Sequence, residues 1–367
     1  MIPEFIHFSP PSKIVFRPGA CSQLGEELAA IGVRRPIVLS GRRTSESVAY
    51  RAAVSSLENF VAFTEIPEHS SAAALRAVLE QARSHRADGF VAVGGGSASD
   101  TAKVAALWLA EGGELEAHAT RFEPPSHLKI PKLEKPKLPI AAVPCTASGA
   151  EATASGAIRT EDGRKLIFSD VKLSARLIVL DPAANTAVPA SVMLATGMNG
   201  LAHCIEALYS KQRTPITDAL ARHAMELFLR ALPGVAREPD SVDQRGELLA
   251  AAHLSGALLV NARTCLHHAI CHAIGAVTGA PHGSSNSVVL PHAMAFNYQS
   301  APQSLPAARV RALQAELGVP ARLRDIGVPR ESLPLIAKKV MGERGLYFNP
   351  RPVRDPGEIE AMLHAAW

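Results

Sequence analysis

Two polar side chains four residues apart, Asn199 and His203, are the first residues in this sequence whose types and spacing could support chemistry. The surrounding stretch, 197–209, has the composition of a helix, and on a helix this spacing places both side chains on one face. Two later segments supply further imidazoles, those of His268, His272 and His282. Because imidazole exchanges protons near neutral pH and also ligates metals, we expect these side chains to converge on one reaction centre.

The identity of residue 199 bears on which chemistry that centre performs. Zn²⁺ and Fe²⁺ prefer anionic or imidazole ligands, whereas the amide oxygen of Asn199 is a neutral, weaker donor. A carboxylate here would complete a metal site, and an amide argues against one. The sequence has 14 histidines, and several, such as His85 and His223, are expected at the surface. His267 cannot share the helical face of His268, so at most one of this pair faces the centre.

A glycine-rich turn, Gly94-Gly95-Gly96-Ser97, follows an apolar stretch and precedes a helix-forming one. Glycines let backbone amides approach a ligand closely, and a helix start offers unpaired N–H groups to an anion. The turn is not a GxGxxG fingerprint, and a tight structural turn is the simpler interpretation of three glycines alone. A second loop, Thr146-Ala147-Ser148-Gly149, favours phosphate binding instead. Asp100, in the first helical turn, either caps the helix or holds the loop.

The residues after the apolar run 36–39 bear on which nicotinamide cofactor would be used. In dinucleotide-binding folds an acidic residue after a strand holds the ribose 2′-hydroxyl, and a basic residue accommodates a 2′-phosphate. Here the run continues as Ser40-Gly41-Arg42-Arg43, without an acidic residue. We expect Ser40 to contact the cofactor and NADPH to be accepted alongside NADH.

The elements that must position these residues divide the chain into two parts. Up to residue 180, short apolar runs alternate with glycine turns and helix-like stretches, which is the pattern of a doubly wound, mostly parallel sheet. We also expect a hairpin with a polar tip at 160–165 and a surface excursion over 123–139. The later stretches expected to be helical are 192–211, 215–231, 243–261, 264–277, 304–317, 330–339 and 356–366. We therefore predict an α/β dinucleotide-binding domain over 1–182 and an all-α domain over 183–367, with the site in the cleft between them.

Composition narrows the class of protein. The 367 residues are 47% hydrophobic and 20% charged, and the net charge of +4 is too mild to indicate a nucleic-acid partner. The five cysteines form no CxxC pair and are typical of buried thiols in a reducing compartment. No signal-peptide pattern and no apolar run long enough for a bilayer are present. We expect a cytoplasmic protein that acts on a small molecule, with no membrane partner.

The motifs taken together resemble those of the iron-containing, group III alcohol dehydrogenases. In chain order they are Gly94-Gly95-Gly96-Ser97-x-x-Asp100-x-x-Lys103, Pro144-x-Thr146-x-Ser148-Gly149-x-Glu151, Gly197-Met198-Asn199-x-x-Ala202-His203-x-x-Glu206, His268-x-x-x-His272 and Pro281-His282-Gly283. The resemblance covers nearly the whole chain. It implies the architecture shared with dehydroquinate synthases, with an N-terminal dinucleotide domain, a helical C-terminal domain and an active site between them.

The resemblance also implies roles for single residues. In that family one Asp and three His typically hold the metal, and the matching positions are Asn199, His203, His268 and His282. His272 is similar to a histidine near the site that is often assigned to proton relay. The family contacts its cofactor at positions that correspond to Thr146, Ser148 and Lys165.

Asn199 departs from the metal-binding pattern and is similar to the residue of the maleylacetate reductases, the branch of this family that lacks a metal. The neighbouring Ala-His-Cys-x-Glu-Ala-Leu-Tyr, the run His267-His268 and the ending Asn349-Pro350-Arg351-Pro352 also look like that branch. The segment 283–286 is closer to ordinary alcohol dehydrogenases. A metal-dependent (Fe or Zn) alcohol or aldehyde dehydrogenase, with Asn199 as a weak ligand, is therefore the alternative.

The function that this resemblance implies is reduction of maleylacetate to 3-oxoadipate, or of a close unsaturated oxo-dicarboxylate, in aromatic-compound degradation. NADH or NADPH would supply hydride without the help of a metal, and hydrogen-bond donors would stabilise the enolate charge. The donors would be His203, His268 and His282, with Asn199 orienting one of them and His272 as general acid. A dinucleotide-binding protein without turnover is a third possibility.

Arg263 lies five residues before His268 and is a candidate partner for a substrate carboxylate. An exposed helix arginine is the simpler interpretation of this residue. The family resemblance further implies a homodimer.

Overall fold

The computed structural model describes residues 4–124, 127–300 and 305–367. A six-stranded parallel sheet forms the centre of the N-terminal half, with the strand order β1-β10-β7-β4-β2-β3. Its strands are β1 (Lys13–Phe16), β2 (Pro36–Leu39), β3 (Val61–Phe63), β4 (Gly89–Gly94), β7 (Ile140–Pro144) and β10 (Leu177–Leu180). Four of them are buried along their whole length, as expected for a parallel sheet with both faces covered.

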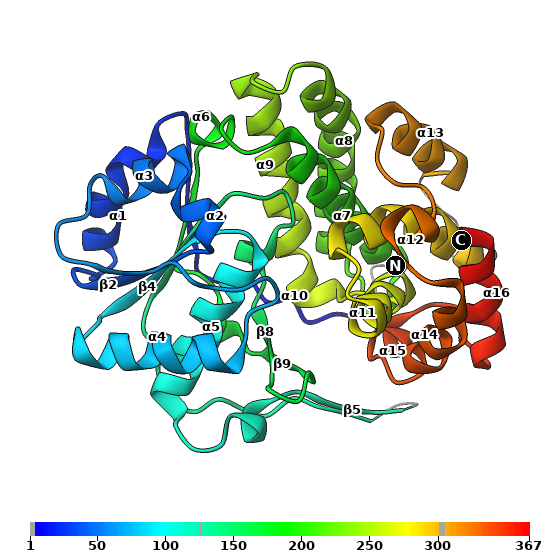
Figure 1. Ribbon diagram of the computed structural model, residues 1–367, viewed down its shortest axis with the longest axis horizontal. Coiled ribbons are helices and arrows are strands. Elements are labelled where there is room, and N and C mark those ends of the chain that lie inside the picture. Colours follow the sequence, from blue (N-terminus) through cyan, green and yellow to red (C-terminus); the bar gives the residue numbers. More distant parts are fainter. Residues whose placement is uncertain (1–3, 125–126, 301–304) are drawn as a thin grey trace.

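Helices cover both faces of this sheet (Figure 1). Alternate residues of β4 show the two layers, because Val91 and Val93 join one buried cluster and Phe90 and Ala92 join the other. The helices of this half are α1 (Leu24–Ala30), α2 (Arg42–Ser45), α3 (Val48–Val54), α4 (Ala72–Ser84), α5 (Gly96–Glu111) and α6 (Pro182–Asn185). This arrangement confirms the predicted doubly wound α/β fold.

Two antiparallel ribbons leave the large sheet. The predicted hairpin is formed by β8 (Ser155–Arg159) and β9 (Lys165–Ser169). Sequence reasoning missed a second ribbon, β5 (Arg121–Glu123) and β6 (His127–Lys129), which begins two residues before the predicted excursion and extends from the lower edge of the view in Figure 1. Residues 125–126, within that excursion, lie outside the described residues.

Among the described residues, the chain after Leu180 forms helices and no further strand. The helices that follow are α7 (Ala190–Tyr209), α8 (Pro215–Arg237), α9 (Val242–Ala257), α10 (Leu259–Ala262), α11 (Leu266–Thr278), α12 (His282–Asn297), α13 (Ala307–Leu317), α14 (Leu333–Val340), α15 (Gly345–Phe348) and α16 (Pro356–Ala366). Short 3-10 turns lie at 20–23, 115–118, 150–152, 171–173, 323–326 and 330–332. Ser304, where the sequence placed the start of one helix, is outside the described residues. Helix α12 was not predicted.

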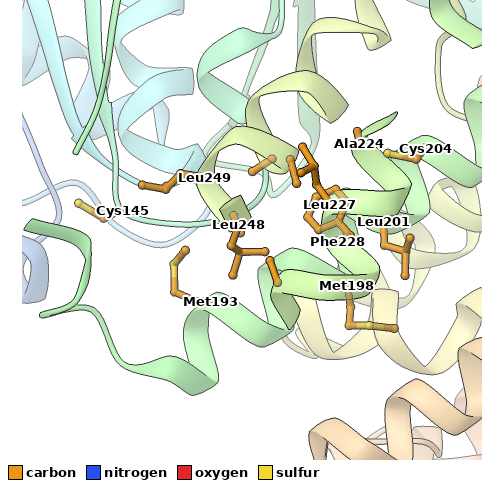
Figure 2. Packing of buried hydrophobic residues seen from close by; sticks show 14 of the residues in the cluster. Cys145, Met193, Met198, Leu201, Cys204, Ala224, Leu227, Phe228, Leu248 and Leu249 are labelled. Atoms are coloured by element: carbon orange, nitrogen blue, oxygen red, sulfur yellow. The ribbon is translucent and has the colours of Figure 1, made fainter. Parts of the chain in front are cut away.

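The two halves share one hydrophobic core. Figure 2 shows Met193, Met198 and Leu201 of α7 packed with residues of α8 and α9, and Cys145 belongs to the same buried cluster. That cluster also contains sheet residues such as Val143. The N-terminal segment crosses to the helical half, because the side chain of Asn261 accepts a hydrogen bond from the Phe8 amide (2.7 Å) and donates one to its carbonyl (3.1 Å). The predicted boundary between residues 182 and 183 therefore stays a prediction.

No single helix in the described part of the chain is both long and apolar enough to cross a membrane. The segments Val242–Ala262 and Leu266–Thr278 pass that test of length and composition only as a pair, which is bent by 102°.

Candidate active site

Helices α7, α11 and α12 bring the candidate histidines together. His203 and His268 stack with ring centroids 4.7 Å apart and planes 21° apart. His272 and His282 form a second stack at 5.6 Å and 18°. The centroid of His268 lies 6.2 Å from that of His272 and 6.3 Å from that of His282, which links the two stacks into one cluster. The convergence expected from the sequence is present.

Glu206 lies on the same face of α7 as Asn199 and His203, and it is hydrogen-bonded to the first turn of α11. Its carboxylate accepts hydrogen bonds from the backbone N–H of His267 (2.9 Å) and from Nδ1 of His268 (2.5 Å). The carboxylate is fully buried, and burial raises the pKa of Glu206 against the influence of His267 and the hydrogen bonds. Helix spacing puts Glu206 seven residues after Asn199, and hence on the same face, two turns along the helix.

The hydrogen bonds determine which nitrogens carry protons. Nε2 of His267 lies 2.9 Å from the Asn286 carbonyl, which only accepts, so the His267 proton is on Nε2. With Glu206 ionised, the proton of His268 is on Nδ1, and its Nε2 presents a lone pair toward the Asn199 amide oxygen at 2.9 Å. A half-turn of the amide brings the –NH2 group to this lone pair, and the two amide orientations have the same shape. An aspartate could not donate this bond.

Burial keeps the imidazoles neutral. The pKa values of His203, His268, His272 and His282 lie well below the ordinary range, and burial is the largest cause for each. The nearby cation of Lys165 lowers the pKa of the last three further. Nδ1 of His203 is buried and has no hydrogen-bond partner among the described residues. At neutral pH the neutral imidazoles, and Nδ1 of His203 in particular, can therefore still form hydrogen bonds with a ligand.

The residues at the family's metal positions do not form a metal centre in this arrangement. Among the described residues, only Glu206, His267 and His268 place three His, Cys, Asp or Glu ligand atoms within 4.8 Å of one another. Their closeness is explained by the hydrogen bonds around Glu206, since His267 is turned to the Asn286 carbonyl. His203, His268 and His282 form no such group, and the donor at residue 199 is an amide. The predicted absence of a metal therefore stays a prediction, which the amide at residue 199 and this arrangement support.

The glycine turn and the loop after β7 face each other at the carboxyl ends of β4 and β7. A Cβ atom on Gly95 would lie 2.9 Å from Cγ2 of Thr146, so a side chain here would have to displace Thr146. Gly94 has a positive φ of 147°, and Gly96 begins α5. The two loops line a small cavity that includes Gly94, Thr146 and Ser148. These residues fit the phosphates of a dinucleotide, which such sheets bind at the carboxyl ends of their strands.

The remaining predicted cofactor residues lie in different surroundings. Ser97 accepts a hydrogen bond from the His69 amide (3.0 Å), and its proton remains free to donate. The hydroxyls of Thr146 and Ser148 lie 3.1 Å apart. Ser40 is fully buried and its hydroxyl donates to the adjacent Gly41 carbonyl at 3.3 Å, so its contact with a cofactor stays a prediction.

Asp100, Lys103 and Lys165 form a charged group between the glycine turn and the histidines. Burial raises the pKa of Asp100 to about 6, although the cations of Lys103 and Lys165 oppose that shift. Burial lowers the pKa of Lys103 to about 8. Lys103 donates to the Ala150 carbonyl (2.6 Å) and the Thr153 hydroxyl (2.8 Å), which holds the loop after β7 against α5. Asp100 makes no side-chain cap of α5 and accepts a hydrogen bond from the Ala157 backbone in β8, so its expected role in holding the glycine loop stays a prediction.

Three residues of the site were not assigned roles by sequence reasoning. Glu206 was part of a quoted motif, and its position on the Asn199 face of a helix was the signal that could have found it. Glu343 lies 3.5 Å from Nδ1 of His272, and the adjacent Arg344 lowers the pKa of that histidine, after burial and Lys165. No spacing in the sequence links residues 343 and 344 to α11.

Comparison with known proteins agrees with this geometry. The profile of the iron-containing alcohol dehydrogenases matches residues 11–182, and that of the family's C-terminal part matches residues 193–309. A maleylacetate reductase of Sphingobium indicum is 29% identical to the chain, over 99% of this chain and 97% of its own length. The solved structure of a 1,3-propanediol oxidoreductase has a TM-score of 0.90 and 26% identity, and covers 100% of both chains. That of maleylacetate reductase from Agrobacterium tumefaciens has a TM-score of 0.85 and 25% identity, over 100% of this chain and 99% of the other.

A doubly wound dinucleotide half joined to a helical half with clustered imidazoles defines a two-domain oxidoreductase that uses a nicotinamide cofactor and a small-molecule substrate. The chain belongs to the iron-containing alcohol dehydrogenase family. Within that family it is similar over its whole length to the maleylacetate reductases, which confirms the resemblance inferred from the motifs.

Proposed function

We propose that this enzyme reduces maleylacetate to 3-oxoadipate in the breakdown of aromatic compounds. Its similarity over the whole length to proteins named maleylacetate reductase supports this proposal. The observation that carries this proposal is the pairing of His268 with the Asn199 amide amid neutral imidazoles and nearby cations. Such a site offers hydrogen-bond donors to a developing oxyanion, which is what reduction of a double bond conjugated to a carbonyl requires.

The reaction divides between cofactor and protein. A nicotinamide cofactor, with its phosphates at the glycine turn and the loop of Thr146 and Ser148, would supply hydride to the carbon of the C=C bond that is remote from the carbonyl. The electron pair of that bond then moves toward the carbonyl oxygen, and N–H groups of His203 and His282 stabilise the enolate. Glu206 and Asn199 hold His268 in one tautomer, with its proton on Nδ1. His272 gives the proton that returns the enolate to a ketone, with Glu343 positioned to orient its ring.

We further propose that the reaction needs no metal. The amide at residue 199 and the arrangement of the histidines support this proposal. The test is elemental analysis of purified protein together with NADH oxidation on maleylacetate before and after strong chelation. We expect substoichiometric metal and unchanged turnover. Stoichiometric iron or zinc whose removal abolishes turnover would overturn metal independence and leave the substrate assignment standing.

The second candidate is a metal-dependent alcohol or aldehyde dehydrogenase. The close overlap with the 1,3-propanediol oxidoreductase structure favours it. A screen of simple alcohols with NAD⁺ and added Fe²⁺ or Zn²⁺ separates the two candidates. Activity on alcohols that exceeds reduction of maleylacetate would replace the first proposal with the second.

Cofactor choice, assembly and compartment are proposed from separate features. The exposed Arg42 and Arg43 after Ser40 support use of NADPH alongside NADH, and a large loss of kcat/KM with NADPH would contradict this. All five cysteines are free and buried, which supports a reducing compartment such as the cytoplasm. We propose a homodimer, because β1 leaves one edge of the sheet without a neighbouring strand in the described part of the chain.

A further inference from the structure

Arg263 has an unusual backbone for a side chain of its size. It follows α10 with φ 64° and ψ 171°, a region that is essentially restricted to glycine. Residues held in this way persist only where the surrounding structure imposes the conformation, and they concentrate at ligand sites. Arg263 is also only half-buried, so its side chain is not fixed by the core.

The segment that begins at Arg344 packs directly on the chain after Arg263. A Cβ atom on Gly345 would lie 2.4 Å from the Cys265 carbonyl oxygen, so the two backbones are in contact. The Leu266 amide donates to the side chain of Asn349 (3.3 Å), and the Cys265 thiol to the Phe348 carbonyl (3.5 Å). These contacts bring Arg344 beside Arg263. Burial, followed by the charge of Arg263, lowers the pKa of Arg344 to about 10.

Neither guanidinium has a hydrogen-bond or ion-pair partner among the described residues. Other arginines of the helical half do: Arg245 donates to the Pro239 carbonyl (2.7 Å) and Arg351 to Glu358 (2.8 Å). Glu343, the acidic neighbour of Arg344 in the sequence, lies 3.5 Å from Nδ1 of His272, and its charge raises the pKa of Arg344. That attraction does not outweigh burial and the charge of Arg263, which leave the pKa of Arg344 lowered, and an anion between the two arginines would relieve their repulsion.

We infer that Arg263 and Arg344 together bind one carboxylate of the substrate. The inference rests on the proposed function, and it adds the residues that distinguish an oxo-dicarboxylate from a simple alcohol. A guanidinium offers paired N–H donors in the geometry of a carboxylate, so two of them saturate its oxygens. The position suits this task, because α11 starts beside the arginine pair and carries His268 and His272 into the site. Carboxylate binding here would fix the reacting end of the substrate against the imidazoles.

The test uses Arg263→Gly and Arg344→Gln, with Arg309→Gln on the exposed surface of α13 as the matched control. Arg263→Gly removes the cation and also relieves the backbone strain, so loss of folding is not the expected result. We expect each variant to raise the KM for maleylacetate about 10- to 100-fold, because a hydrogen-bonded charge pair is lost. The KM for NADH should stay unchanged. Arg344→Lys should recover only part of the loss, because lysine cannot form the paired bonds.

A binding measurement separates this inference from the proposed function. Calorimetry with 3-oxoadipate and with 3-oxohexanoate, in which a methyl group replaces the carboxylate at the reacting end, should show discrimination in the wild type and none in Arg263→Gly or Arg344→Gln. Turnover of maleylacetate with an unchanged KM in both variants would overturn the arginine site and leave the function intact. Absence of turnover in the wild type, with oxo-acid binding still weakened in both variants, would overturn the function and leave the arginine site.

Discussion

At the scale of single residues, the side chain of Asn199 determines which group faces the lone pair on Nε2 of His268. With Nδ1 of His268 bound to Glu206, Nε2 needs a donor, and the amide of Asn199 provides one in one of its two orientations. A carboxylate has no proton to give at neutral pH, so it would leave the lone pair free for a cation. In the metal-free site proposed above, the amide would thus take the place of a metal ion at this nitrogen.

Asn199→Asp should convert the site toward metal binding. We expect the affinity for Zn²⁺ to rise about 10- to 100-fold, because an anionic ligand then faces a free imidazole nitrogen. Calorimetric titration with Zn²⁺ measures this change. Asn185→Asp is the matched control, since Asn185 is also buried but contacts Arg245 and no histidine. Equal Zn²⁺ affinity in the wild type and Asn199→Asp would refute this account of residue 199.

Glu206→Gln should reverse the protonation pattern of His268. A glutamine that still accepts from the His267 amide must turn its –NH2 group to Nδ1 of His268, which moves the imidazole proton to Nε2. We expect kcat to fall about 10- to 100-fold with little change in KM, by analogy with lost carboxylate–histidine support elsewhere. Nitrogen NMR of labelled histidine reports the tautomer directly. An unchanged tautomer together with unchanged kcat would contradict the role of Glu206.

His272 should govern the pH dependence of the reaction. Burial, Lys165 and Arg344 hold its pKa in the free protein below the ordinary 6.5, and Glu343 is its acidic neighbour. If the protonated ring is the acid, its population falls tenfold for each pH unit above that pKa. We expect kcat/KM for maleylacetate to fall about tenfold per unit from pH about 6.5 to about 8. His272→Gln should be slower and lack this slope, whereas a flat wild-type profile would exclude His272 as the acid.

Sequence reasoning reached the histidines but only part of their surroundings. Asn199, His203 and Glu206 lie on one helix, so their shared face follows from the helical period alone. The meeting of His272 with Glu343 depends instead on how a later segment packs on α11, which no local pattern encodes. The arginine pair is of the same kind, since contact between Gly345 and Cys265 brings it together.

At the scale of elements, local signals explain both the successes and the misses. Thr214 with Pro215 and Asp355 with Pro356 are N-terminal signals, and α8 and α16 begin directly after them. Helix α12 was missed because it begins with His282-Gly283-Ser284-Ser285 and contains Pro291, which are weak helix formers. Tertiary burial offsets this weak propensity, since the helix is buried over most of its length.

One contact between elements holds the loop after β7, which carries Thr146 and Ser148, against the helical half. A Cβ atom on Gly256 of α9 would lie 1.9 Å from the carbonyl oxygen of Gly149, so both backbones touch at glycine. Gly256→Ala must displace the loop that carries Thr146 and Ser148. We expect a loss of about 1–3 kcal/mol in the free energy of unfolding and weaker NADH binding, measured by denaturant titration and fluorescence.

Gly275→Ala on α11 is the matched control for that substitution, because its nearest atom would lie at an ordinary 3.8 Å. We expect it to be neutral or to stabilise the protein by up to about 1 kcal/mol. Equal effects of the two substitutions would show that the glycine contact does not position the loop.

At the scale of the whole molecule, the site lies where two differently built halves meet over a common core. The sheet ends at the glycine turn, α9 runs along the junction, and α7 carries Asn199 and His203 beside it (Figure 1). The Ala147 amide donates to Thr196 of α7 (2.9 Å), so the loop after β7 is directly linked to the helix that carries His203. Because one hydrophobic cluster spans both halves, we regard the junction as a fixed part of the fold.

The outer edge of β1 is the feature through which two copies would pair. The Arg17 amide donates to the carbonyl of Leu180 in β10, and the Lys13 amide donates to the carbonyl of Arg176, just before that strand. The alternating amides of Ile14 and Phe16 therefore face away from β10. Their side chains are 47% and 49% exposed. An exposed edge with apolar side chains is a template for a second strand.

Ile14→Pro should therefore weaken the dimer without disturbing the sheet, since proline removes only an amide that faces outward. Ile14→Thr, which keeps that amide, is the matched control. We expect the wild type to sediment as a dimer at micromolar concentration, and Ile14→Pro to raise the dissociation constant about tenfold or more. NADH binding should be equal in both variants, because the cofactor loops lie at β4 and β7. If Ile14→Pro remains as dimeric as Ile14→Thr, the copies associate through another surface, and the pairing of β1 edges is wrong.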